Sequence, residues 1–239
     1  PTRRSSDLMT GRAIGQGMGE GIGKIMNYGI QGEIIYAFVI IVCSLMIYFG
    51  TKELYNLSSQ KGIKYFRLSF LFFAFAYFFR SFIKIILFYF EIDELRTILP
   101  IFGNITLFFF MYFGSMAIFY LLYSVMWKKW KSKLGIYLFH IVAFILAIAT
   151  SFFGNQIIYF LTNILLFIFI IVTIFISRKQ SKKKPNNLYI IYILLFIFWI
   201  LNILDVLIPN FLKTTQLFIY LFSLGVFLLI LYKVIKKTG

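Results

Sequence analysis

Residues 71–90 read LFFAFAYFFRSFIKIILFYF, a stretch whose only charged side chains are Arg80 and Lys84. An α-helix rises about 1.5 Å per residue, so about 20 apolar residues suffice to cross the hydrocarbon of a bilayer. The whole chain shares this character, since 61% of its 239 residues are hydrophobic and 13% are charged. A soluble domain carries about 25% charged residues. The stretch therefore predicts a membrane-spanning helix, and the composition predicts that it is one of several.

Six further apolar blocks flank this helix, and short polar connections separate them. We therefore predict an all-α fold, an integral membrane bundle of seven transmembrane helices that occupies residues 33–239. A spanning helix needs about 17–25 apolar residues, and the predicted helices lie at 34–50, 66–90, 99–126, 134–153, 157–177, 188–208 and 213–233.

Basic residues alternate between the two sides of the predicted bundle. The first, third and fifth loops and the C-terminus contain sixteen Lys and Arg residues, whereas the loops of the other side contain Arg96 and Lys213. Lys and Arg concentrate in cytoplasmic loops, so we predict a multi-pass protein of the cell membrane with its N-terminus outside and its C-terminus inside. The net charge of +16 lies in these loops rather than along one face, which argues against a nucleic-acid partner.

The first 32 residues are predicted to form a segment separate from the bundle. Residues 1–8, PTRRSSDL, resemble translated sequencing-adapter read-through and are set aside. The glycine-rich remainder places Gly15, Gly19 and Gly23 at a spacing that lines one face of a helix. Each glycine costs a helix about 1 kcal/mol relative to alanine, so we expect a mobile or interface-lying segment. A helix docked on the bundle and a cleaved leader are the alternatives.

Opposite charges occur at matching depth in two of the predicted helices. Arg80 lies about 20 Å along its helix from Arg67, and Asp205 lies about 25 Å along its helix from Leu188, both toward the outside. Charged side chains inside a bilayer are costly and mark a pathway, a site or a structural pair. We therefore predict that Arg80 pairs with Asp205. Polar residues at this level complete a candidate ligand-binding cavity that opens outward: Lys84, Asn104, Asn163 and Asn202, with Glu33, Ser81, Thr106 and Thr162 beside them.

Three interpretations of this polar group stay open. In the first, the pair formed by Arg80 and Asp205 only holds its two helices together, and Lys84 extends to the outer headgroups. Alternatively, the group binds a small polar or anionic ligand, or an ion. The third interpretation is a pathway for protons or ions.

The remaining reactive side chains predict packing rather than chemistry. Cys43, the single cysteine, lies inside the first apolar block. His140, the single histidine, lies in the fourth block, where we expect packing or a hydrogen bond between helices. G-x-S-x-G, H-E-x-x-H and a close carboxylate pair inside the membrane are all missing from the sequence. We therefore expect no enzyme, no cofactor and no metal site.

The basic inner loops, and an aromatic second helix in which LFFAFAYFFR (71–80) ends in arginine, resemble the seven-helix membrane sensor regions of prokaryotic signalling proteins. This resemblance implies a receptor or sensor module in the lipid bilayer that signals through its basic cytoplasmic loops. The chain stops at Gly239 without a kinase or cyclase domain. The resemblance therefore implies output through a separate cytoplasmic signalling protein, or a truncated gene.

A second resemblance supports an alternative. FAYFFR (75–80) and IFWILN (197–202) align when the first three helices are set against the last three. This plan is similar to that of small seven-helix sugar transporters, in which two parallel repeats of three helices are joined by one further helix. The Pro-Gln motif of those transporters is missing here, and Pro100 and Pro209 lie in outer loops instead. The alternative prediction is a small-solute or ion transporter, and a structural membrane subunit comes third.

The loop charges give a test of orientation. A cysteine placed at Ser181, in the fifth loop, should react with an impermeant thiol reagent only after the cells are permeabilised. A cysteine placed at Asn155, in the fourth loop, should react in intact cells. The reverse labelling pattern would contradict the predicted topology.

Overall fold

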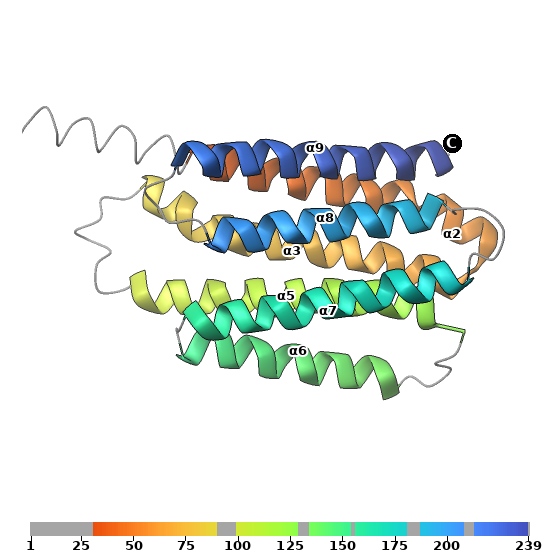
Figure 1. Ribbon diagram of the computed structural model, residues 1–239, viewed down its shortest axis with the longest axis horizontal. Helices are drawn as coiled ribbons and strands as arrows, with labels where there is room; N and C mark the ends of the chain where they lie inside the picture. The colour runs from red at the N-terminus through yellow and green to blue at the C-terminus, as the bar shows by residue number, and fades with distance from the viewer. Residues whose placement is uncertain are drawn as a thin grey trace, which may run out of the picture.

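The computed structural model describes residues 31–89, 99–128, 134–153, 156–180, 187–207 and 213–238, and its described elements are all α-helices. The predicted N-terminal segment lies outside these residues except for Gln31 and Gly32, which belong to the first helix. The helices run side by side with their long axes nearly parallel (Figure 1). They are a helix over 31–50, α2 (Lys52–Ser58), α3 (Lys61–Tyr89), α5 (Leu99–Met126), α6 (Leu134–Phe153), α7 (Gln156–Gln180), α8 (Asn187–Leu207) and α9 (Lys213–Thr238).

Six of these helices are long and apolar enough to cross a membrane, and α8 contains a shorter apolar stretch, Tyr189–Asp205. Each predicted block therefore corresponds to one long helix within the described residues, and α2 is an additional short helix. The outer faces of the bundle are apolar as well, which is what a lipid surrounding requires and a soluble surface avoids. Exposed examples from different helices are Phe38, Phe144, Phe175 and Phe218.

The first predicted loop is more ordered than the sequence indicates. The chain turns at Thr51 and continues as α2, and α3 already begins at Lys61 instead of at residue 66. Lys, Glu and Leu favour a helix, and Glu53 lies in the first turn of α2, where a negative charge is favourable. The helix ends at Ser58, and the following residue, Ser59, adopts a left-handed conformation with φ 51° and donates its N–H to Tyr55 O at 2.8 Å.

Six long helices are arranged in pairs around an axis between α3 and α8 (Figure 1). Phe66 of α3 and Tyr192 of α8 meet near this axis, with ring centroids 6.5 Å apart. The helix over 31–50 packs on α9 through the stacked rings of Tyr36 and Tyr220, as α7 packs on α5. Figure 1 thus places the helix over 31–50 beside α9, α3 beside α8, and α5 beside α7. The repeat indicated by the two aligned hexapeptides stays a prediction.

Helix α6 lies outside this group of six and packs on α5 and α7 (Figure 1). Its buried positions repeat every three or four residues and include Ala143 and Ala147, both fully buried. Small residues at this spacing let two helix backbones approach closely. His140 adds a polar contact, because its two ring nitrogens lie 2.8 Å from the hydroxyl of Tyr112 and 3.1 Å from that of Tyr120 on α5. The predicted hydrogen bond between helices is thereby confirmed.

Aromatic rings fill the centre of the bundle. Phe70 on α3, Phe198 on α8 and Phe227 on α9 are fully buried. The ring of Phe227 lies 6.2 Å from that of Phe70 and 5.0 Å from that of Phe198, measured between centroids. Contacts of this kind bring dispersion and quadrupole attraction without polar groups. They close the middle of the bundle between its two ends.

Basic side chains gather at one end of the bundle, which we call the basic end. It includes α2 and the end of α9 (Figure 1). The exposed ones among the described residues are Lys52, Lys61, Lys64, Lys128, Arg178, Lys179 and Lys236. Trp127, predicted at this boundary, lies partly buried just after α5, and Trp130 is outside the described residues.

Close packing of α3 on α5 at the basic end depends on Gly62. A Cβ at this position would lie 2.8 Å from Ser124 O, a backbone atom, and 2.7 Å from Trp127 Nε1. Gly62→Ala should therefore force the two helices apart and destabilise the protein by about 1–3 kcal/mol, the usual range for overpacking. Unfolding of the purified protein in detergent, followed by circular dichroism, measures this loss.

Gly225→Ala is the matched control. No atom lies within 4 Å of a Cβ added at Gly225, so this variant should be as stable as the wild type or slightly more so. Equal stability of the two variants would contradict the close approach of α3 and α5.

Candidate functional site

Four charged side chains form an ion-pair cluster at the end of the bundle opposite the basic end. Arg80 on α3 donates from Nη2 to Asp205 Oδ2 on α8 at 2.7 Å. Its Nε donates to Glu33 Oε1 on the helix over 31–50 at 3.4 Å. Lys84, one turn further along α3, bonds the other carboxylate oxygen of Glu33. The pairing of Arg80 with Asp205, predicted from matching depth, is confirmed.

Neutral side chains satisfy the remaining atoms of this cluster. Asn202 Oδ1 accepts bonds from Arg80 Nη1 at 3.2 Å and from the hydroxyl of Tyr77 at 2.7 Å. Gln216 on α9 donates its amide N–H to Asp205 Oδ1 at 3.0 Å. The ion-pair cluster and these amides therefore connect four helices: the helix over 31–50, α3, α8 and α9.

Helical spacing explains why α3 supplies so many of these groups. Tyr77, Arg80 and Lys84 are separated by three and four residues, so they lie on one face of the helix. Ser81 belongs to the same turn, but its hydroxyl donates to Phe78 O of its own helix at 3.1 Å. The face of α3 that carries Arg80 is thus the one turned toward Glu33, Asn202 and Asp205.

The ion-pair cluster is buried and electrically balanced. The side chains of Asp205 and Glu33 are 7% and 9% exposed, and those of Arg80 and Lys84 are 15% and 31% exposed. Two positive charges face two negative charges, which gives a formal net charge of zero. Removing ions from water is costly unless each finds an opposite charge and hydrogen bonds. A change in one member therefore leaves a charge without compensation.

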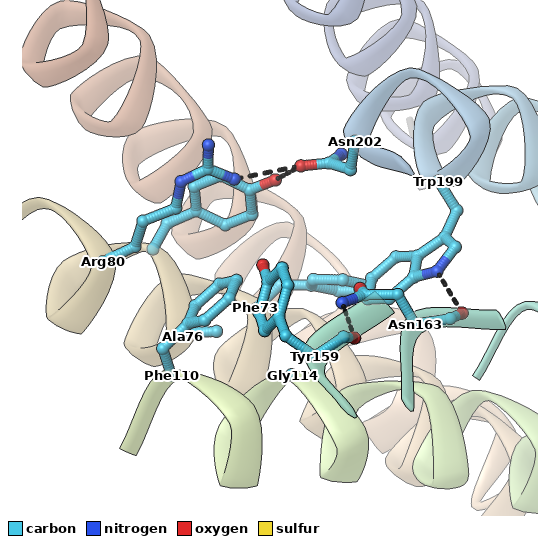
Figure 2. Close-up of a pocket in the computed structure, with 10 residues that line it drawn as sticks. Phe73, Ala76, Arg80, Phe110, Gly114, Tyr159, Asn163, Trp199 and Asn202 are labelled. Atoms are coloured by element: carbon cyan, nitrogen blue, oxygen red, sulfur yellow. Dashed lines mark hydrogen bonds between the residues drawn. The ribbon is translucent and has the colours of Figure 1, made fainter. Parts of the chain in front are cut away.

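A pocket lies next to the ion-pair cluster, between α3, α5, α7 and α8 (Figure 2). The space between its side chains is about 330 Å³, including the part open to the surroundings, but only about 10 Å³ admits the centre of a water molecule. It therefore has room for about one water. Half of its ten lining residues are aromatic, and the others include Arg80 and two asparagines: Phe73, Ala76, Tyr77, Arg80, Phe110, Gly114, Tyr159, Asn163, Trp199 and Asn202.

The predicted ligand-binding residues fall into three groups. Arg80 and Asn202 line the pocket, while Asp205 and Lys84 belong to the ion-pair cluster. Asn163 lines the pocket from α7, but its amide nitrogen donates to Tyr159 O at 2.8 Å. Asn104 is exposed on α5 and is not one of the pocket residues. The hydroxyls of two predicted neighbours bond carbonyls of their own helices: Thr106 and Thr162.

Several residues of the site escape prediction from the sequence. Tyr77 could have been found, because it lies one turn before Arg80 on the same face of α3. Gln216 lies in the first turn of the last helix, and nothing in the sequence indicates that it lies at the depth of Asp205. Tyr159 and Trp199 look like ordinary apolar positions, although Trp199 Nε1 donates to Asn163 O at 3.3 Å across the pocket. Within the described residues, no group of three His, Cys, Asp or Glu side chains is placed to hold a metal ion.

Comparison with known proteins gives one relative. No family model matches the chain, and no solved structure matches it. A protein of Archaeoglobus fulgidus, described as uncharacterised, is 32% identical over 217 residues, which cover 87% of this chain and 93% of that protein. The similarity is therefore not confined to one segment of the bundle.

Removing Arg80 and Asp205 together should cost less than the sum of the single losses. Arg80→Ala leaves Asp205 without a cation, and Asp205→Ala leaves the charge of Arg80 only partly compensated. Each single variant should lower the free energy of unfolding by about 3–5 kcal/mol, the usual cost of breaking a buried ion pair. The double variant keeps Lys84 bonded to Glu33 and stays electrically balanced. Unfolding free energies measured in mixed detergent micelles give the coupling between the two sites.

Ser81→Ala provides the control for this cycle. Its hydroxyl bonds only a carbonyl of α3, so its effect should add to that of Asp205→Ala. Strict additivity of Arg80→Ala and Asp205→Ala would mean that the two side chains do not interact.

Proposed function

The chain belongs to one family with the Archaeoglobus fulgidus protein, and we propose that it acts as a membrane receptor or sensor whose outward-facing polar site controls the packing of its helices. Three lines support this proposal: the charge asymmetry of the bundle, the access to the site and the ion-pair cluster. No enzymatic role is included in the proposal.

The proposed orientation in the membrane follows from the Lys and Arg residues at the basic end. Seven exposed Lys and Arg residues of the described part lie there, opposite the ion-pair cluster. Since Lys and Arg favour the cytoplasmic side, the basic end faces the cytoplasm and the ion-pair cluster faces outward. The N-terminus is then outside and the C-terminus inside, in the cell membrane. A cytoplasmic signalling protein is the natural partner of such a basic surface, because charge complementarity guides association.

One observation carries the receptor proposal: Arg80 ties together three helices at the outer end of the bundle. It bonds Glu33 on the helix over 31–50 and Asp205 on α8, while belonging to α3 itself. On the inner side of the pocket, fully buried rings such as Phe70 and Phe198 close the bundle. A ligand that reaches Arg80 from outside thus meets the contact that holds the helices together.

Signalling in this proposal is a shift between two packings. A ligand that offers Arg80 another hydrogen-bond partner weakens its bonds to Glu33 or Asp205, so the helix over 31–50 or α8 moves relative to α3. The ligand shifts this equilibrium only by its difference in affinity for the two packings. The shift reaches the cytoplasm because each of these helices continues to the basic end (Figure 1).

A transporter of small solutes or ions is the second candidate. The repeat predicted from the aligned hexapeptides, which sets 31–50, α3 and α5 against α7, α8 and α9, favours it. Transporters built from parallel repeats hold their substrate between the repeats, near the middle of the membrane. Here Arg80 and Asn202, which come from the two aligned hexapeptides, bond each other across the axis.

The receptor proposal predicts movement at the basic end when the ion-pair cluster is altered. Spin labels at Lys61→Cys on α3 and Lys236→Cys on α9, in a Cys43→Ser background, report the distance between two exposed sites. Asp205→Asn should shift or broaden this distance, because Asp205 bonds both Arg80 and Gln216. Ser81→Ala should leave the distance unchanged. Pulsed electron spin resonance of protein in nanodiscs makes the measurement.

Flux measurements separate the two candidates. Proteoliposomes offered sugars, amino acids and monovalent ions should show no saturable uptake if the protein is a receptor. Saturable uptake that Asp205→Asn abolishes would replace the receptor proposal by the transporter. An unchanged label distance in Asp205→Asn would contradict the coupling between the two ends.

A further inference from the structure

The pocket presents aromatic faces to a positive charge. Five of its lining residues are aromatic, and they come from α3, α5, α7 and α8: Phe73, Tyr77, Phe110, Tyr159 and Trp199 (Figure 2). The guanidinium carbon of Arg80 already lies 5.8 Å from the ring centroids of both Tyr77 and Phe110. Aromatic faces attract cations, and sets of such rings recognise quaternary ammonium groups.

Arg80 also retains capacity for an anion. A guanidinium has five N–H donors. Its bonds to the described residues use three of them, one each on Nε, Nη1 and Nη2, for Glu33, Asn202 and Asp205. One N–H remains on each of the two terminal nitrogens. A carboxylate can accept hydrogen bonds from such donors.

The balance of charge restricts the ligand further. The ion-pair cluster is neutral, so a bound anion or cation would add an uncompensated charge to a site that is largely buried. A zwitterion adds both signs and leaves the sum at zero. A neutral molecule would also keep the balance, but it would use neither the aromatic faces as a cation site nor the free donors of Arg80 as an anion site.

On the basis of the proposed function, we propose that the pocket binds a small zwitterion that carries an ammonium group and a carboxylate. The carboxylate bonds the terminal nitrogens of Arg80, and the ammonium lies among the aromatic rings. The free space admits little more than one water, so the ligand enters only as Arg80 and Asn202 move aside. Binding is thereby coupled to the bonds that hold α3 to α8.

Matched probes test the class of ligand. Glycine and glycine betaine carry both charges, tert-butylacetate has the shape of betaine but only the negative charge, and tetramethylammonium has only the positive one. Equilibrium binding to the full chain in nanodiscs, by calorimetry, should show a zwitterion bound at least about tenfold more tightly than tert-butylacetate or tetramethylammonium.

Two variants test the place of binding. Phe110→Leu removes a ring that lines the pocket, and it should weaken zwitterion binding by about tenfold. Phe113→Leu removes a ring of the same helix that does not line the pocket and packs on Phe79 and Phe109, and it should bind as the wild type does. Unfolding temperatures of both variants show that they are folded.

Each contrary result overturns the zwitterion proposal. Equal or tighter binding of tert-butylacetate would indicate an anion site instead, and the absence of binding by both zwitterions would reject the class. Equal weakening by Phe110→Leu and Phe113→Leu would place the ligand elsewhere. The receptor proposal stands or falls separately, because the label distances in Asp205→Asn are measured without any ligand.

Discussion

A guanidinium inside an apolar bundle must have its charge balanced and its N–H groups bonded, and Arg80 imposes this requirement on the structure. Its bonds to Glu33 and Asp205 fix the helix over 31–50 and α8 against α3. Asp205 in turn holds Gln216, which brings α9 into the same network. Helices in a bilayer gain little from apolar contact with each other, because lipid is equally apolar. Directional bonds of Arg80 and Asp205 therefore hold four helices together at this end.

A second arginine of α3 acts at the basic end. Arg67 donates from Nε to Tyr48 O at 3.0 Å, and its guanidinium lies 4.8 Å from the centroid of the Tyr48 ring. The helix over 31–50 is thus bonded to α3 near both ends, by Arg80 through the carboxylate of Glu33 and by Arg67 through a backbone carbonyl. A ligand that binds beside Arg80 reaches that contact and not the contact of Arg67, which lies at the basic end of α3. In the proposed receptor, the contact of Arg67 is then the pivot when the contact of Arg80 opens.

The length of the apolar blocks was enough to predict every long helix, and matching depth was enough to predict that Arg80 pairs with Asp205. Depth along a helix follows from counting residues, but rotation about its axis does not. Helix α5 is apolar on every side, so its sequence does not say that Phe110 lines the pocket while Asn104 is exposed. The bond between Glu33 and Lys84 could not be predicted from the sequence for the same reason, because it depends on which faces of two helices meet.

The predicted repeat is compatible with a receptor as well as with a transporter. Tyr77 and Trp199 are aligned in the two hexapeptides, and each bonds the first helix of its own predicted repeat, through Tyr36 and Asn163. Arg80 and Asn202 are aligned too, but only one of them is charged. A carrier must present its site to both faces in turn, which here requires the buried aromatic rings beyond the pocket to separate. Exchanging a partner of Arg80 at the end opposite the basic end requires no such separation, so the proposed receptor needs the smaller rearrangement of this bundle.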